Sequence, residues 1–336
     1  MSLSPKRRLL ARVADAAGLA RLVDVARGWR GLLVLNYHRV GTPGNSLFDH
    51  DLYSATADDF DQQVRYLKKN FDVIGLDGLD DLLVRRGRQR AVMVTFDDGY
   101  LDNYELAFPV LRDQNVPAVF FVTTGFLDDR PLAWWDEIAW MVNRSSRSSL
   151  ELKSWLAQPV TWVNGHRGAA IGRLLKTFKA LPTKETKSFL DDIAAETGSG
   201  LAPKSAADGL WMNWDHVREM VRGGMSIGSH TVTHPVLSRV DDDQLHVELG
   251  ESKRRLEQEL AITIDSISYP VGQPDSFTPR CWEVAEQLGY KWAFSYYGGF
   301  IPELANRFDL KRTAIELDCC LPTFRSMTRV PTVFHS

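Results

Sequence analysis

Short apolar runs bounded by glycine, proline or polar residues recur along the chain, and stretches with helical spacing lie between them. The runs cover residues 32–37, 72–76, 91–96, 118–123, 225–229, 264–269 and 292–295. Nearly continuous apolar character is typical of strands covered on both faces, and such strands alternating with helices are typical of a mainly parallel sheet. The pattern therefore predicts an α/β fold.

Helical spacing is clearest at residues 57–70 and 244–260, and the second stretch follows three aspartates that suit a helix N-terminus. Strand patterns disappear between about residues 128 and 209, where polar stretches such as 145–149 appear. Apolar positions persist in this region, so we expect an insertion made of a few helices.

The first thirty residues differ from the rest in charge. Residues 1–30 contain seven basic and two acidic side chains, and apolar residues recur among them at nearly helical spacing. We expect a basic amphipathic helix ahead of a domain formed by residues 31–336. Such a helix can lie on the inner face of a membrane as a peripheral contact, or it can pack on the outside of the domain, which is the commoner arrangement.

Composition narrows the class of protein. The 336 residues are 44% hydrophobic, enough for a large core, and the net charge of −3 without Arg/Lys-rich blocks argues against a nucleic-acid partner. Three cysteines are too few and too irregularly spaced for a disulfide framework or a CxxC zinc site. Without an apolar stretch of roughly 20 residues or a signal-peptide core, the expected location is cytoplasmic, with the peripheral membrane contact as an open addition.

Two adjacent carboxylates follow the run at residues 91–96. Asp97 and Asp98 stand before Gly99, which lets the backbone turn sharply. Sites in α/β folds form at the C-terminal ends of strands, and neighbouring side chains there point in different directions. One aspartate can therefore bind a metal ion while the other stays free as a base.

A second polar motif follows the run at residues 225–229. His230 and His234 are four residues apart, so both imidazoles can face one point if the chain turns after the strand. Together with an aspartate they give three protein ligands, which leaves an open coordination position for water, as a hydrolytic metal site requires.

The strings TFDDGY (95–100) and SHTVTHP (229–235) resemble the first two motifs of the polysaccharide deacetylase family, the NodB-homology group of carbohydrate esterases. Residues 35–40 (LNYHRV), 120–123, 268–272 (SYPVG) and 289–295 extend the resemblance, and LNYHRV is most similar to the exopolysaccharide-associated branch. The resemblance implies a distorted (β/α)7 barrel, here with the helical insertion.

The resemblance also implies roles for individual residues. Asp97 would be the general base, and Asp98, His230 and His234 would hold one divalent metal ion, for which zinc suits the ligands best and cobalt, nickel or manganese are alternatives. The main-chain N–H of Tyr100 would stabilise the oxyanion, and Tyr269 with Pro270 would line the sugar-binding wall.

The chain departs from the family pattern in two places. Ser268 stands near the position where many members have an arginine that orients the base, and Arg312 is our candidate to replace it. The family's late histidine, the general acid, is missing. His38 at the end of the first strand could supply the proton, or Asp97 could return the proton it has taken. A structural role for His38 is equally compatible with the sequence.

These observations predict a metal-dependent carbohydrate N-deacetylase that acts on an N-acetylhexosamine unit of a polysaccharide, an oligosaccharide or a lipid-linked glycan precursor. The same site could serve an O-acetyl esterase or a deformylase, and a non-catalytic glycan-binding relative is the alternative outside enzymes. Trp134 and Trp135 could form a sugar-stacking platform, although such a pair is more often part of a helical core.

Overall fold

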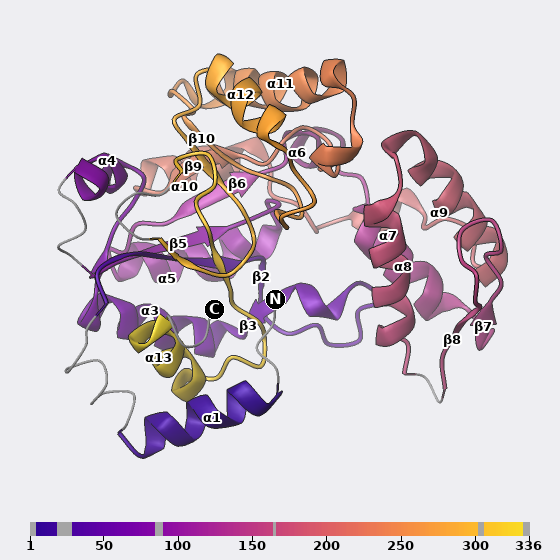
Figure 1. The fold of residues 1–336 in the computed structure, drawn as a ribbon, viewed down its shortest axis with the longest axis horizontal. Helices are drawn as coiled ribbons and strands as arrows, with labels where there is room; N and C mark the ends of the chain where they lie inside the picture. Colours follow the sequence, from indigo (N-terminus) through magenta and orange to yellow (C-terminus); the bar gives the residue numbers. More distant parts are fainter. Residues whose placement is uncertain (1–4, 19–28, 85–89, 164–165, 302–305, 332–336) are drawn as a thin grey trace.

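Each apolar run predicted as a strand contributes to one central sheet in the computed structural model, which describes residues 5–18, 29–84, 90–163, 166–301 and 306–331 (Figure 1). These strands are β1 (Gly31–Tyr37), β4 (Asp72–Val73), β5 (Arg90–Phe96), β6 (Val119–Val122), β9 (Ser226–Ser229), β10 (Ser266–Ser268) and β11 (Trp292–Phe294). The predicted α/β class is confirmed.

The sheet is curled and mainly parallel. Its order is β11-β10-β9-β6-β5-β1, with all neighbours parallel and β4 paired with β5. Two strands missed in the sequence, β12 (Phe300–Ile301) and β13 (Thr313–Ala314), pair with β1. Leu310 bridges to β11 just before β13 joins β1, so one segment links the two sides of the sheet and gives the predicted distorted barrel.

Helices cover the outer face of this sheet. Helix α3 (Ala57–Asn70) begins after Thr56, whose side chain accepts the N–H of Asp59, and it buries Phe60 and Leu67. Helix α11 (Asp242–Leu260) has the same kind of cap in Asp241. The others are α4 (Asp77–Val84), α5 (Phe108–Asp113), α6 (Thr124–Asp129), α10 (Trp214–Arg222), α12 (Pro279–Gln287) and α13 (Leu321–Arg329).

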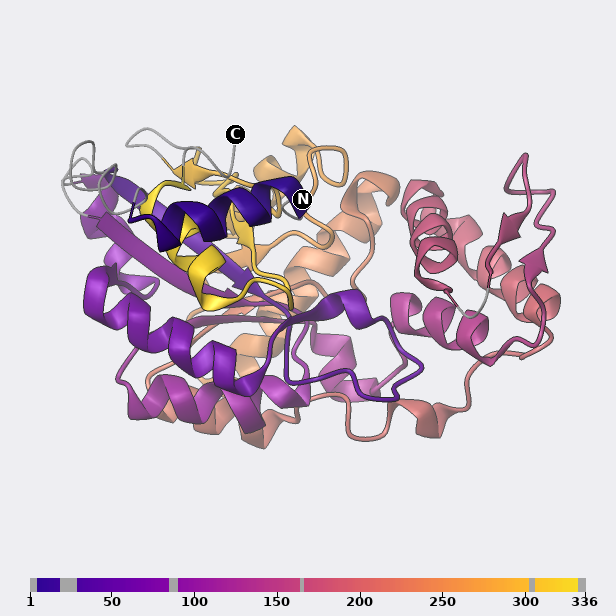
Figure 2. The same ribbon diagram turned by 90° about the horizontal axis from the view of Figure 1, so that it is seen from below.

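The region predicted as an insertion projects from one side of the barrel (Figures 1 and 2). It contains α7 (Trp134–Arg144), α8 (Gly168–Ala180) and α9 (Thr183–Thr197), which pack around a separate apolar cluster that includes Leu174 and Phe189. Its hairpin, β7 (Ser149–Leu150) and β8 (Val160–Thr161), was not predicted from the sequence, because two-residue strands carry no periodicity. The domain boundaries proposed above remain predictions.

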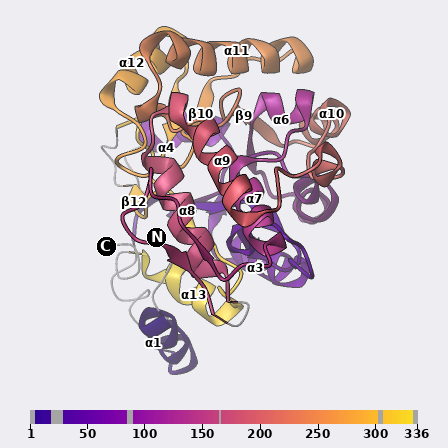
Figure 3. The same ribbon diagram turned by 90° about the vertical axis from the view of Figure 1, so that its right-hand side faces the viewer.

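Helix α1 (Pro5–Ala16) lies beside α13 at one end of the molecule (Figure 3). Ser326 donates a hydrogen bond to the carbonyl oxygen of Ala11 at 2.7 Å, and Arg329 pairs with Asp15 at 3.4 Å. Residues 1–4 and 19–28 of the predicted N-terminal helix lie outside the described residues. None of the described helices combines the length and apolar character needed to cross a membrane.

Candidate active site

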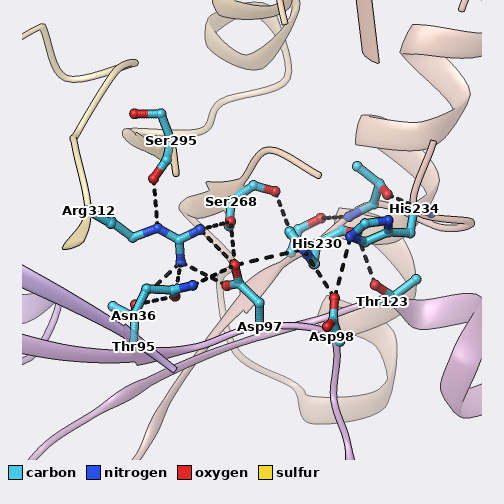
Figure 4. Close-up of polar contacts among 12 residues, drawn as sticks. Asn36, Thr95, Asp97, Asp98, Thr123, His230, His234, Ser268, Ser295 and Arg312 are labelled. Atoms are coloured by element: carbon cyan, nitrogen blue, oxygen red, sulfur yellow. Dashed lines mark hydrogen bonds and ion pairs between the residues drawn. The ribbon is translucent and has the colours of Figure 1, made fainter. Parts of the chain in front are cut away.

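Two buried carboxylates stand at the C-terminal end of β5. Asp97 and Asp98 are 3% and 2% exposed. Asp98 has φ 76° and Gly99 has φ 97°, so the chain turns through the left-handed region immediately after the strand. As Figure 4 shows, this turn sends Asp97 toward Arg312 and Asp98 toward the two histidines.

The histidine motif forms a second tight turn, which follows β9. Thr231 and His234 have φ values of 67° and 58°. Glu248 of α11 accepts hydrogen bonds from the main-chain N–H groups of residues 232 and 233 at 2.8 and 2.9 Å. Because this buried carboxylate holds the turn, the rings of His230 and His234 lie 4.8 Å apart, centroid to centroid.

The histidines and Asp98 converge on one point. His230 Nδ1 lies 2.8 Å from the carbonyl oxygen of Ser268, which only accepts, so Nδ1 carries the proton and Nε2 offers a lone pair. The Nε2 atoms of His230 and His234 lie 3.5 and 3.4 Å from Asp98 Oδ1. The three potential ligand atoms lie within 4.8 Å of one another.

This group of side chains fits a divalent metal ion. Asp98 Oδ1 is buried and has no hydrogen-bond partner within the part of the chain that the structure describes. A buried carboxylate oxygen of this kind is costly unless a cation or donor meets it. One carboxylate and two imidazoles are a donor set that zinc and similar ions accept.

Burial and mutual charge set the protonation of these groups. Burial, aided by the charge of His230, lowers the pKa of His234 to about 3. Burial acts the same way on His230, but the carboxylates of Asp97 and Asp98 outweigh it and raise the pKa of His230. His234 is therefore neutral near pH 7, as a metal ligand must be.

Asp97 forms a two-pronged ion pair with Arg312. The guanidinium is fully buried and donates to Asp97 Oδ1 and Oδ2 at 2.8 and 2.7 Å. It also donates to Asn36 Oδ1 at 2.5 Å and to Ser268 Oγ at 2.7 Å. Burial would raise the pKa of Asp97, but the charge and hydrogen bonds of Arg312 hold it well below its usual range.

A cavity of about 140 Å³ opens onto these groups, and both the barrel and the insertion line it. Its remaining walls come from His38, Tyr269, Val271 and Tyr296 of the barrel, Asp49, Asp51 and Leu52 of one loop, and Trp134, Trp135, Leu175 and Lys179 of the insertion. Several of these residues also line a cavity of about 500 Å³ along α8, so a longer ligand has room beyond the carboxylates.

The other predicted residues occupy different surroundings. His38 lines the cavity with its ring edge against Tyr296, and burial lowers the pKa of His38 despite the nearby carboxylates. Tyr269 also lines the cavity, whereas Pro270 is buried and outside the lining. The Tyr100 hydroxyl donates to buried Asp136 at 3.1 Å, and the Tyr100 main-chain N–H makes no hydrogen bond among the described residues.

Asn36, Lys179 and Tyr296 are among the site residues that the sequence did not single out. Asn36 could have been predicted, because it is a polar residue inside the apolar run of β1 and a buried amide needs hydrogen-bond partners. No sequence feature predicted Lys179 or Tyr296 as site residues. They reach the cavity from a surface helix and a loop, and their positions depend on how the insertion and the barrel pack.

Comparison with known proteins matches the chain to a family. The family model described as "Polysaccharide deacetylase" matches residues 85–293, more than half of the chain. The Bacillus subtilis protein named "Putative polysaccharide deacetylase YxkH" is 22% identical over 263 residues. That alignment covers 77% of this chain, and the chain spans 62% of the length of YxkH.

Solved structures of low sequence identity share the fold. The Streptococcus pyogenes deacetylase PplD, solved with acetate, superposes with a TM-score of 0.58 at 18% identity and covers 91% of this chain and 98% of its own. IcaB from Ammonifex degensii gives a TM-score of 0.53 at 19% identity, with coverage of 90% and 98%. The barrel is therefore of the NodB type, as expected.

Proposed function

The chain belongs to the polysaccharide deacetylase family, and from this premise we propose that it hydrolyses the acetamide of an N-acetylhexosamine unit in a glycan. The observation that carries the proposal is that one cavity contains both a set of potential metal ligands and a carboxylate outside that set. Asp98, His230 and His234 offer ligand atoms to a metal ion, while Asp97 stays outside that set and is held by Arg312.

Asp98, His230 and His234 would hold the ion, with zinc as the first choice and cobalt, nickel or manganese as alternatives. When bound, a divalent cation supplies Lewis-acid polarisation of the acetyl carbonyl and lowers the pKa of water. The chain's own contribution is to fix the ligands. The Ser268 carbonyl orients His230 and Glu248 fixes the turn that carries His234.

Asp97 is the acceptor for the proton of the attacking water. Arg312 keeps this carboxylate ionised and fixes the direction of both oxygens, because the two-pronged pair leaves it little rotational freedom. This assigns to Arg312 the orienting task that the sequence suggested.

Protonation of the leaving amine has two candidate donors. His38 faces the cavity close enough to the carboxylates for their charges to act on it. Asp97 can alternatively return its proton, as one residue that serves first as base and then as acid. Substitution His38→Gln separates these routes: deacetylation persists if Asp97 is the donor and is lost if His38 is.

The Tyr100 main-chain N–H, which has no hydrogen-bond partner among the described residues, donates a hydrogen bond to the oxyanion of the tetrahedral intermediate. The Tyr100 hydroxyl donates to Asp136 and accepts from the indole N–H of Trp135, both on α7. These bonds hold the residue whose N–H is needed, so the insertion supports the barrel's chemistry.

The cavity favours a glycan as the ligand. Trp134 offers an aromatic surface at the wall, with Lys179 Nζ 5.8 Å from its ring centroid, although Trp134 also stacks on Phe178 within the insertion. The adjoining cavity along α8 gives space for neighbouring sugars of a polysaccharide, an oligosaccharide or a lipid-linked precursor. A role in exopolysaccharide synthesis, as in the branch that LNYHRV resembles, belongs to this proposal.

The test is acetate release from N-acetylglucosamine oligomers and lipid-linked N-acetylhexosamines, by protein stripped with a chelator and reloaded with zinc, cobalt or nickel. Metal-restored release from an amide supports the deacetylase. Release only from O-acetyl or N-formyl sugars would instead indicate an esterase or a deformylase.

Asp97→Asn provides the matched control. This variant should retain the metal, because Asp97 is not among the proposed ligands, and it should lose turnover. Binding of glycan and metal by the unmodified protein without any turnover would indicate a non-catalytic glycan-binding relative.

A further inference from the structure

Helix α1 presents its large apolar side chains outward. Leu9, Leu10 and Val13 are 64%, 58% and 54% exposed, while Ala11 on the opposite face is fully buried. A surface helix normally directs its large apolar residues to the core and its polar ones to water. The reversed arrangement on α1 leaves an apolar patch that a second surface can cover.

The same helix is rich in positive charge. Its sequence contains one acidic residue, Asp15, and four basic ones, which are Lys6, Arg7, Arg8 and Arg12. Asp15 is taken up by ion pairs with Arg329 at 3.4 Å and Arg325 at 3.7 Å. The one acidic side chain of α1 is therefore paired with arginines of α13.

A cationic cavity lies next to this helix, between α3 and α13. Its volume is about 360 Å³, and its charged lining consists of Arg65, Lys69, Arg325 and Arg329. Arg65 pairs with Asp61 at 2.7 Å, but Lys69 is exposed and has no ion pair or hydrogen bond among the residues that the structure describes. Two carboxylates thus face four cations, and the cavity keeps a net positive charge.

We propose that α1 and this cavity form a docking surface for an anionic lipid membrane. Leu9, Leu10 and Val13 would enter the boundary between headgroups and acyl chains, and the cavity between α3 and α13 would bind lipid phosphates. Figures 1 and 3 place α1 and α13 together at the end of the molecule opposite α11, so both features can meet one plane.

The charge and the apolar side chains together favour this occupant. A second copy of the chain would bring an equally basic surface against the first, and like charges at an interface oppose association. Nucleic acid would pair with the cations but would make no favourable contact with the three exposed aliphatic side chains, since base recognition relies on aromatic stacking.

The experiment is co-sedimentation of the full chain with vesicles of phosphatidylcholine alone and of phosphatidylcholine mixed with phosphatidylglycerol. We expect binding to the anionic vesicles only, weakening as salt rises. The double variant Leu9→Glu/Leu10→Glu should lower the affinity about tenfold or more, because it removes apolar contact and adds repulsion. Lys69→Glu should lower it by roughly fivefold or more.

Val247→Glu is the matched control, because Val247 on α11 is 53% exposed and lies at the opposite end of the molecule. It should bind vesicles as the unmodified chain does, and unfolding midpoints should show that all variants fold. No binding of the unmodified chain to anionic vesicles, or equal loss in Val247→Glu, would overturn the proposal. Self-association that Leu9→Glu/Leu10→Glu abolishes, without vesicle binding, would overturn it in favour of a second copy.

Discussion

Neighbouring Asp97 and Asp98 take different partners because of one unusual backbone angle. Asp98 lies at φ 76°, a conformation that costs a non-glycine residue about 1 kcal/mol. Thr231 and His234 share this strain in the second turn. Strained residues of this kind gather at sites whose surroundings fix them, and here the strain aims Asp98 and His234 at a common point.

The buried pair of Asp97 and Arg312 gives the first prediction. Arg312→Met leaves the Asp97 carboxylate without its cation in a fully buried place, which should destabilise the protein by about 3–5 kcal/mol in urea unfolding. Arg312→Lys keeps the charge but loses the two-pronged geometry, so the kcat for deacetylation should fall about a hundredfold.

The double variant Asp97→Asn/Arg312→Met is the control for charge. It removes both charges together and should recover most of the stability lost in Arg312→Met, but none of the activity. If Arg312→Met alone were as stable as the unmodified protein, the proposed dependence of Asp97 on its cation would be wrong.

Asp136 gives a prediction about pH. Burial raises the pKa of Asp136 to about 7, although the Asp49 N–H and the Tyr100 hydroxyl both donate to it. Between about pH 4 and pH 7 the folded state holds a proton that the unfolded chain has released, so stability falls as the pH rises. From pH 5 to pH 8 the unmodified protein should lose about 3 kcal/mol more unfolding free energy than Asp136→Asn. Equal losses in urea titrations would contradict this.

At the scale of elements, the site depends on turns held from a distance by a helix. Glu248 is the seventh residue of the outer helix α11, yet it is only 3% exposed, and its carboxylate accepts from two main-chain N–H groups and from Thr233 Oγ. The helix thus fixes the loop between the two histidines, and metal affinity should depend on it.

Glu248→Gln tests this dependence. A neutral amide cannot accept all three hydrogen bonds as strongly, so the turn should loosen and zinc affinity should fall about 10–100-fold, as for other groups that orient ligands. Glu251→Gln, on the same helix but half exposed, is the matched control and should leave the affinity unchanged. Isothermal titration of the stripped proteins measures both, and equal affinities would remove Glu248 from the site's support.

The sequence predicted individual elements better than it predicted which elements and side chains pack together. Long apolar runs such as β1 and β5 carry a strong pattern, whereas the two-residue β13 carries none, although it links the sheet's sides beside Arg312. Asp97, Asp98 and the two histidines were found because each follows a recognisable strand. Lys179 could not be found in this way, because its place at the cavity depends on how α8 packs against the barrel.

At the scale of the whole molecule, the hydrophobic clusters of the barrel and of the insertion both contribute to the cavity, through Tyr269 on one side and Trp134 and Leu175 on the other. One lies within the barrel and the other within the insertion, around α7, α8 and α9. Trp135 lies in a further cluster with Tyr100 and Trp211, where its indole donates to the Tyr100 hydroxyl and its ring lies 4.6 Å from that of His234. The cavity wall therefore exists only when both parts are folded together.

Metal removal should consequently lower the free energy of unfolding of the whole fold. A ligand that binds only the folded state stabilises it by RT ln(1 + [L]/Kd), about 4 kcal/mol when free metal exceeds Kd a thousandfold. Stripping with a chelator should lower the urea midpoint and reloading zinc should restore it. Asp98→Asn should abolish this gain because it replaces a proposed ligand, whereas Asp97→Asn should keep it because Asp97 pairs with Arg312 instead. A midpoint indifferent to zinc in the unmodified protein would argue against the metal site, and a gain lost in Asp97→Asn would assign that carboxylate to the metal instead of to the proton.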